Sequence, residues 1–221
     1  MLAVIAMLAA APALAKEPAL GFYVGGGVGQ SNFRSDYASQ VNHAYEGTGF
    51  TVDVANVTDN KDTAWKAYAG WRFHQFGAIE AAWLDFGEAR TRYEIGVPNQ
   101  GVATRDGRYR LSGAELSALG IVPIGDRATL YAKAGALFSR LEYDESGTDQ
   151  FGAPASFSHS NRETKLLWGL GGSFEVVESL TVRVEWQRAE DVGERFALTD
   201  SGNGRFEHVD MATIALQWRF R

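Results

Sequence analysis

Serine and histidine are the residue types in this chain best suited to nucleophilic or metal chemistry. A hydrolytic site needs a nucleophile, a base within hydrogen-bond reach and a third group that orients the base. Only Ser158-His159-Ser160 places the first two types together, in a polar stretch predicted to be a loop. The chain has no cysteine, which excludes thiol catalysis and Cys-based metal sites. The four histidines fit no metal-ligand spacing and stand at His43, His74, His159 and His208. We therefore predict that the protein is not an enzyme and has no cofactor or metal.

A second set of reactive side chains consists of charges within otherwise apolar, alternating stretches. Charges held out of water must be paired or hydrated. If the turn near Gly125 is symmetric, Glu115 faces Gly135 and Lys133 faces Ser117, so Glu115 and Lys133 are the best candidate ion pair. The predicted polar network is Lys66, Arg72, Glu80, Glu115, Lys133, Arg183 and Glu185, with Lys165 and Arg219 on the same face.

These charges must be positioned by β-strands, because the apolar residues recur with a period of two. The 221-residue chain has 25 glycines, 5 prolines and 12% aromatic residues, a composition that favours strands. The stretch that ends the chain shows the pattern most clearly, with one wholly apolar face and one largely polar face. The predicted strands are Phe22–Gln30, Trp65–Phe73, Gly77–Phe86, Arg108–Val122, Thr129–Leu141, Thr164–Phe174, Leu180–Arg188 and Met211–Phe220.

The connections between these strands alternate in length. Long polar connections cover 31–62, 88–107, 144–161 and 191–207, whereas short turns lie near 74–76, 123–126 and 176–179. Transmembrane barrels have short periplasmic turns and long extracellular loops. We therefore predict an all-β fold, an eight-stranded antiparallel transmembrane β-barrel with up-and-down topology. A strand-like patch at Phe50–Val57 leaves a count of ten strands open.

Aromatic residues lie on the apolar face near strand ends, as in the two girdles of a membrane barrel. A lipocalin-like barrel would crowd them into a narrow lumen. We therefore predict that the apolar face contacts lipid and that the polar face lines the lumen. These aromatic residues are Trp65, Trp71, Phe73, Trp83, Phe138, Trp168, Phe174, Trp186, Trp218 and Phe220.

The N-terminus predicts export. Leu2–Ala10 is apolar and Ala13-Leu14-Ala15 forms an A-x-A cleavage pattern, typical of a secretory signal peptide. Residues 1–15 are predicted to be this signal peptide, and 16–221 a single outer-membrane barrel domain. Past residue 15 no apolar run reaches the roughly 18–20 residues of a spanning helix. We expect the protein in the outer membrane of a Gram-negative cell. The net charge of -6 and the lack of a basic stripe argue against nucleic acid as a partner.

Six short segments occur in an order that resembles a known family. They are Gly21–Gly29, Ile79–Gly87, Leu130–Gly135, Gly169–Phe174, Arg183–Trp186 and Trp218-Arg219-Phe220. Together they are similar to small eight-stranded outer-membrane barrels related to the membrane domain of outer-membrane protein A and to opacity-type surface antigens. The resemblance implies that Trp218 and Phe220 form the terminal signal for the barrel-assembly machinery, although Arg221 follows the usual final aromatic residue. Some small barrels of this kind resemble lipid A deacylases or palmitoyl transferases, so a lipid A-modifying enzyme is an alternative.

We predict a structural or surface-interaction role for the long outer loops, because binding residues concentrate on loops held by a rigid scaffold. Expected partners are outer-membrane lipid and lipopolysaccharide, the barrel-assembly machinery and a host or cell-surface ligand, with the protein monomeric. The polar network is expected to fill and rigidify the lumen, because eight strands leave little room inside. A gate, or a channel for small or hydrophobic solutes, is the alternative. Candidate contacts to lipopolysaccharide phosphates are Arg90, Arg92, Arg105, Arg108 and Arg110.

Overall fold

The computed structural model describes residues 20–34, 46–47, 49, 51–53, 60–99, 101–193 and 206–220. Nine strands make up its regular structure in these ranges: β1 (Gly21–Arg34), β2 (Thr51–Asp53), β3 (Lys61–His74), β4 (Gly77–Val97), β5 (Gly101–Ile124), β6 (Ala128–Thr148), β7 (Pro154–Val177), β8 (Leu180–Val192) and β9 (Phe206–Arg219). No helix in the described ranges is long and apolar enough to cross a membrane. The predicted signal peptide, residues 1–15, lies outside them.

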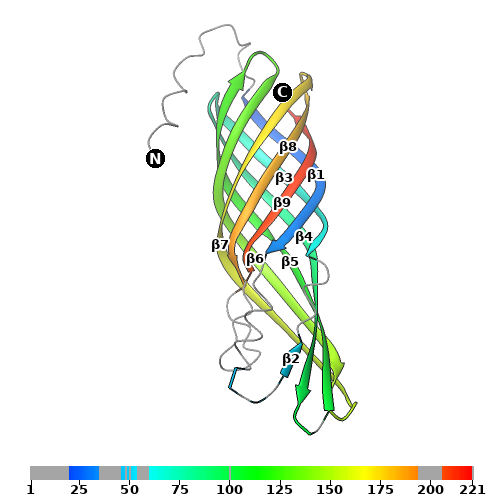
Figure 1. The fold of residues 1–221 in the computed structure, drawn as a ribbon. Helices are drawn as coiled ribbons and strands as arrows, with labels where there is room; N and C mark the ends of the chain where they lie inside the picture. The colour runs from blue at the N-terminus through cyan, green and yellow to red at the C-terminus, as the bar shows by residue number, and fades with distance from the viewer. Residues whose placement is uncertain are drawn as a thin grey trace.

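Eight of the strands close into a barrel (Figure 1). Each pairs antiparallel with its neighbours in the order β4-β3-β1-β9-β8-β7-β6-β5, and β5 returns to β4. The first and last strands lie side by side, with Val28 opposite Ile214. The predicted eight-stranded antiparallel barrel is therefore confirmed. Of the predicted strand-like patch Phe50–Val57, the described residues 51–53 form β2, which pairs with Glu94–Gly96 of β4 outside the ring, so the closed ring has eight strands and not ten.

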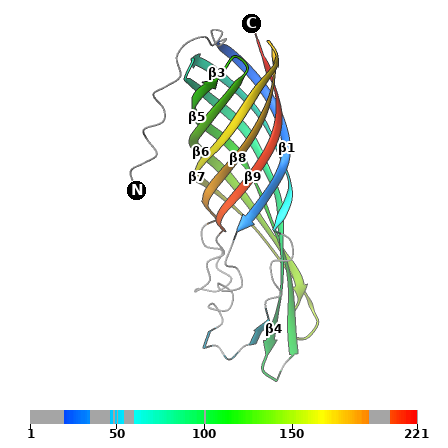
Figure 2. The ribbon, with the colours of Figure 1, turned by 45° about the horizontal axis from the view of Figure 1, so that its top comes forward.

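The barrel has two unlike ends. Short turns at 75–76, 125–127 and 178–179 close one end, which we call the turn end and which is uppermost in Figure 1. At the other end β4, β5, β6 and β7 run on as 21-, 24-, 21- and 24-residue strands, whereas β1, β3, β8 and β9 have only 13 or 14 residues. A membrane-spanning strand needs only about 9–11 residues. The long strands therefore project beyond the ring as a four-stranded sheet (Figure 2).

We call this projection the sheet extension and define it as residues 88–97, 101–110, 142–148 and 154–160. It corrects the sequence prediction that 88–107 and 144–161 are loops, because both are hairpins paired almost to their tips. The prediction failed because the outward face of these strands carries charged residues beyond the bilayer, so the stretch lacks the apolar outer face of a membrane strand, although Ala89, Tyr93 and Ile95 on the other face are buried. A bulge at Asp85–Glu88 marks its base, where Gly87 has a φ of 76° that favours glycine.

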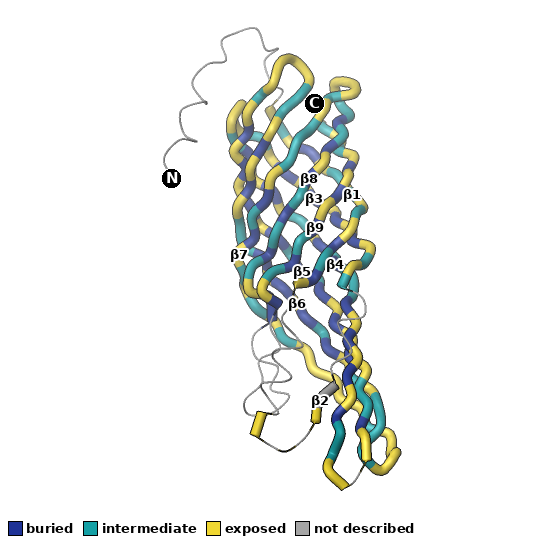
Figure 3. Tube along the Cα trace, in the orientation of Figure 1, coloured by how far each residue is buried: buried dark blue, intermediate teal, exposed yellow. Residues whose placement is uncertain are grey.

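Side chains alternate between the inside and outside of the ring, which Figure 3 shows as alternating buried and exposed positions. The predicted girdle residues face outward. Eight of them, Trp65, Trp71, Phe73, Trp83, Phe138, Phe174, Trp218 and Phe220, are 42–52% exposed, whereas Trp168 and Trp186 partly cover each other at 5.0 Å between ring centroids. Such a wide exposed apolar wall suits lipid rather than water.

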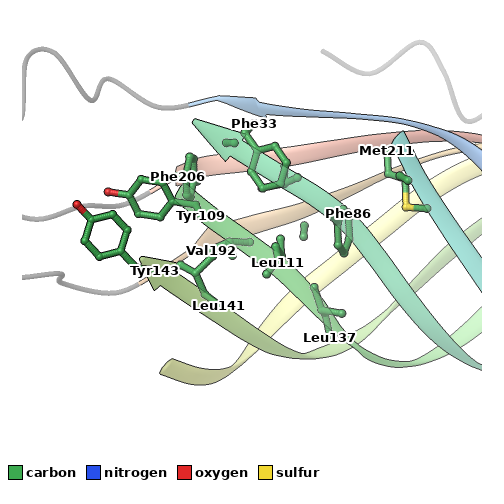
Figure 4. Packing of buried hydrophobic residues seen from close by; sticks show 14 of the residues in the cluster. Phe33, Phe86, Tyr109, Leu111, Leu137, Leu141, Tyr143, Val192, Phe206 and Met211 are labelled. Atoms are coloured by element: carbon green, nitrogen blue, oxygen red, sulfur yellow. The ribbon is translucent and has the colours of Figure 1, made fainter. Parts of the chain in front are cut away.

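The sequence predicted a lumen that is polar along its whole length, and the structure differs from this. On the turn-end side the lumen holds buried charges, whereas towards the sheet extension most of its buried side chains are apolar (Figure 4). In β6, for example, buried Lys133 is followed by buried Leu137 and Leu141. We call the second group the apolar plug and define it as Phe33, Leu84, Phe86, Tyr109, Leu111, Leu137, Leu141, Tyr143, Leu167, Phe206, Val209 and Met211. In the parts of the strands near the sheet extension, both the inward and the outward residues are apolar. The alternation of apolar and polar residues therefore predicted the lipid-facing residues but not the apolar plug.

Candidate functional site

Six of the seven predicted network residues meet inside the barrel, each less than 5% exposed: Lys66, Glu80, Glu115, Lys133, Arg183 and Glu185. Three cations face three carboxylates, so the formal charges cancel. Arg183 contacts Glu80 and also lies 2.9 Å from Glu185 Oε2. The charges come from β3, β4, β5, β6 and β8, so their contacts cross the lumen and tie together strands that are not neighbours in the sheet. Full pairing is what permits such charges in a dry interior.

Glu185 is the centre of this network. Its carboxylate lies 2.5 Å from Lys66 Nζ and 2.8 Å from Lys133 Nζ, and it accepts a hydrogen bond of 2.7 Å from the Tyr131 hydroxyl. Lys133 also lies 2.8 Å from Glu115 Oε1, as the sequence suggested. The predicted register was wrong, however. Glu115 faces Leu137 rather than Gly135, because the turn is centred on Asp126 and not on Gly125.

Three tyrosines complete the network, and the sequence analysis did not single them out. Tyr23 donates to Glu80 at 2.9 Å, and the guanidinium of Arg183 lies 4.6 Å from the ring centroids of both Tyr68 and Tyr131. Each ring occupies space left by an inward-facing glycine on a neighbouring strand: Gly70 under Tyr23, Gly25 under Tyr68 and Gly171 under Tyr131. Inward tyrosines opposite glycines were the signal that could have located this site in the sequence.

The other predicted lumen charges lie away from the network. Arg72 and Arg219 are at the mouth of the turn end, where Arg219 Nη2 is 3.0 Å from Glu175 Oε2. Lys165 pairs with Glu163 at 3.0 Å on the opposite side of the network. The lumen is therefore layered, with arginines at the turn end, the charge-balanced network next and the apolar plug beyond it.

The outward face of the sheet extension carries four of the five arginines predicted to contact phosphate. Arg90 faces Arg108 across β4 and β5, and Glu88 and Asp106 face the other two. We call Arg90, Arg92, Arg108 and Arg110 the arginine ladder. Three of them converge on the carboxylate of Glu88, with Arg90 Nε at 2.9 Å, Arg108 Nε at 3.6 Å and Arg110 Nη2 at 3.5 Å. Arg110 Nη1 also lies 3.9 Å from Glu142 Oε2, so the ladder combines several guanidinium groups, each with five N–H donors, with few carboxylates.

Arg92 and Arg105 differ from these three. Arg92 Nε lies 2.6 Å from Asp106 Oδ1, and that hydrogen bond and charge raise the pKa of Arg92. Arg105 does not belong to the ladder, because it lies on the other face of β5, with its Nε 3.1 Å from Glu145 Oε1. The sequence prediction grouped it with the ladder although strand alternation separates Arg105 from Arg108.

The histidines form no catalytic arrangement in the described ranges. His43 lies outside those ranges, and His74 lies at the turn end. His159 lies on β7 opposite Tyr143, so its predicted position in a loop was wrong, whereas Ser158 donates to Asp144 Oδ1 at 2.7 Å on the other face. His208 lies on β9, 3.7 Å from Asp210 Oδ2. The described residues contain no cluster of three or more His, Asp or Glu side chains that could hold a metal ion.

A closed ring of eight strands with an apolar outer wall and a filled interior is typical of small membrane-spanning β-barrels. Comparison with a family model identifies which family of such barrels this is. The model of OmpA-like transmembrane domains matches residues 18–221. The chain belongs to this family. As an OmpA-like transmembrane domain it is an outer-membrane β-barrel, a class in which the short turns are periplasmic and the long connections are extracellular.

Solved structures of outer-membrane proteins share the barrel at low sequence identity. Neisserial surface protein A is 14% identical, with 90% of this chain and 97% of that chain covered and a TM-score of 0.52. Ail of Yersinia pestis is 16% identical over 90% and 99% of the two chains, with a TM-score of 0.47. OprG of Pseudomonas aeruginosa is 13% identical over 92% and 98%, with a TM-score of 0.46. No curated protein sequence matches the chain. These likenesses concern the fold alone.

Proposed function

We propose that this OmpA-like barrel is a surface-interaction protein whose binding element is the extracellular sheet extension. The observation that carries the proposal is the unequal length of the strands: β5 and β7 have 24 residues where β1 and β9 have 14. A membrane anchor needs no such extension, because about 9–11 residues per strand span the bilayer. A rigid sheet held clear of the membrane is well suited to present a binding surface.

The edge of this sheet supports a protein partner at the cell surface. β8 pairs with β7 only over 167–177, so residues 154–166 of β7 have no strand partner on that side within the described ranges. An unpaired edge offers backbone donors and acceptors that an extended segment of another protein can join. Phe157, 56% exposed, lies on this strand and offers an apolar anchor. We propose a host or cell-surface protein as the partner of this edge.

The arginine ladder supports a second contact, with the phosphates of lipopolysaccharide. The outward aromatic residues Trp83 and Phe138 lie in one row across β4, β5 and β6. The next outward row holds the pairs Asp85–Ser112 and Arg140–Arg162, and the ladder begins in the row after that. The ladder therefore stands near the level of the outer-leaflet headgroups. Arg90, Arg92 and Arg108 also border an open hollow of about 690 Å³. The ladder side chains are 50–63% exposed, and a guanidinium group binds phosphate oxygens through paired N–H donors, which makes phosphate a suitable ligand for them.

Glutamine substitution of Arg90, Arg108 and Arg110 together tests this contact. Purified protein is titrated with vesicles containing lipopolysaccharide and with otherwise equal vesicles of neutral phospholipid. We expect the triple variant to lose most of its preference for lipopolysaccharide, whereas Arg105→Gln, on the opposite face, keeps it. A triple variant with undiminished preference would show that the ladder is a solvated surface and nothing more.

A sealed barrel is the state we propose for the lumen, in place of a channel. The charge-balanced network and the apolar plug both support it, because together they fill the described interior on each side of Lys133. We also propose no lipid A-modifying activity, since Ser158 and His159 lie on opposite faces of β7. Deacylation of lipid A by purified protein, abolished by His159→Ala, would overturn that part of the proposal.

The last part of the proposal concerns export and insertion into the outer membrane. We propose cleavage after residue 15, insertion by the barrel-assembly machinery and a monomeric barrel in the outer membrane. Trp218 and Phe220 support recognition of β9 by that machinery, because both are exposed, at 50% and 52%, Trp218 on the last strand of the barrel and Phe220 directly after it. N-terminal sequencing of the membrane-extracted protein should begin at Lys16. A Phe220→Ala variant should accumulate in the periplasm, and normal insertion of that variant would refute the assembly signal.

A further inference from the structure

The periplasmic end of the lumen contains a cavity of about 50 Å³ whose wall is strongly cationic. Arg183 forms part of its wall next to the network, while Arg72 and Arg219 lie at the mouth. Among the ten described residues that line it, none is acidic. The remaining wall supplies hydroxyl and amide groups, including Thr129, Ser173 and Gln217. A small polar cavity with this lining suits an anion.

Among the described lumen cations near this cavity, Arg72 is the one without a carboxylate partner. The six network charges cancel, and Arg219 pairs with Glu175 at 3.0 Å. Arg72 donates only to the backbone oxygen of Gln75, at 2.7 Å, and its Nε is buried without a hydrogen-bond partner. No carboxylate in the described part of the chain pairs with it. Arg183 and Arg219 are each offset by a carboxylate, whereas Arg72, which is partly buried, has no carboxylate partner in the described residues to offset its charge.

We propose that this cavity binds a small inorganic oxyanion, phosphate or sulfate, between Arg72 and Arg219. The free Nε of Arg72 and the planar shape of both guanidinium groups match the oxygens of such an ion better than they match a spherical halide. Thr129 and Ser173 share a hydrogen bond, with their hydroxyl oxygens 2.6 Å apart, so one of the two hydroxyl protons remains to be donated from the opposite wall. The volume is several times the roughly 10–15 Å³ that one water requires, so an ion fits with water beside it.

Equilibrium dialysis of the folded barrel against radiolabelled phosphate, in non-ionic detergent and low salt, tests the site. We expect saturation near one phosphate per barrel. Arg72→Gln should weaken binding at least about tenfold, because a charge-assisted hydrogen bond is lost. Arg127→Gln is the matched control, since Arg127 is exposed in a turn at the same end and lies outside the cavity lining. This control should bind within about twofold of the parent.

A second variant separates loss of the site from loss of the fold. Ser173→Leu fills the cavity while it keeps all three arginines, and heat-modifiable gel migration reports whether each variant is folded. Folded Ser173→Leu should bind no phosphate. Sulfate should compete with phosphate and chloride should compete weakly. Equal binding by the parent, Arg72→Gln and Ser173→Leu would overturn the proposal, as would equal loss in Arg127→Gln or equal competition by chloride. None of these results depends on the extracellular interactions proposed above.

Discussion

Neutralising Glu185 should destabilise the barrel more than any change to its outer charges. The carboxylate accepts from Lys66, Lys133 and Arg183, all within 2.9 Å, and from the hydroxyl of Tyr131. Glu185→Gln keeps the shape of the side chain but leaves three buried cations facing two carboxylates. Removing one partner of a buried ion pair costs about 3–5 kcal/mol, and we expect a loss in the free energy of unfolding within that range.

The measurement is equilibrium unfolding in urea of protein refolded into lipid vesicles, followed by tryptophan fluorescence. Glu142→Gln is the matched control. Its partners Arg110 and Arg140 lie at 3.9 and 2.9 Å on the outward face of the sheet, where ion pairs contribute about 0–1 kcal/mol.

A compensating change sharpens the test. The carboxylate that lies beside Lys66 is that of Glu185, so adding Lys66→Met to Glu185→Gln returns the network to two cations and two carboxylates. We expect the double variant to recover a large part of the lost stability. A loss below about 1 kcal/mol in Glu185→Gln, or no recovery in the double variant, would refute the idea of a dry, charge-balanced network.

Three further predictions concern the packing of the barrel interior and its lack of conductance. Gly171→Ala should reduce stability by about 1–3 kcal/mol, because the new methyl group would overlap the Tyr131 ring. Gly172→Ala should be tolerated, because its methyl group would lie 3.4 Å from the nearest atom, a side-chain carbon of Leu130; equal effects of both would refute the glycine–tyrosine packing. Phe86→Ala, in the apolar plug, should cost about 3–5 kcal/mol in the same urea assay, and an effect below about 1 kcal/mol would mean a loosely packed plug. The parent protein should show no stable conductance in planar bilayers; stable conductance abolished by Glu115→Ala or Lys133→Ala would establish a pore.

Much of the barrel could be predicted because the lipid imposes a simple rule on each strand. Within the bilayer the outward positions must be apolar, so stretches such as 211–220 have a clear period of two. The sheet extension could not be predicted in the same way. Glu88–Ile95 alternates charged outward residues with the buried Ala89, Tyr93 and Ile95, but its outward face contacts water, so it lacks the apolar outer face that marked the membrane strands. The apolar plug was missed because Leu137 and Phe138 are both apolar while one faces in and the other out.

For the candidate sites, the sequence predicted which charged side chains face the lumen but not which of them contact each other. Inward charges such as Glu115 and Lys133 could be assigned to the lumen, because a charge on an alternating strand must avoid lipid. Which of them meet could not be derived, since a change of one residue in the centre of the turn at 125–127 moves Glu115 from Gly135 to Leu137. Contacts across the lumen, such as Lys66 with Glu185, depend on the closure of the whole ring and on no local pattern.

Trimming the sheet extension tests the central proposal most directly. Arg90 pairs with Arg108 and Asp144 pairs with Ser158, so replacing 91–107 and 145–157 with Asn-Gly turns should close both hairpins in register. Cells carrying the parent, the trimmed barrel or no barrel are compared for surface exposure and for adhesion to host cells and to one another. We expect the trimmed barrel to insert and to show heat-modifiable migration like the parent, but to lose the adhesion that the parent confers. Full adhesion by a correctly inserted trimmed barrel would contradict the account.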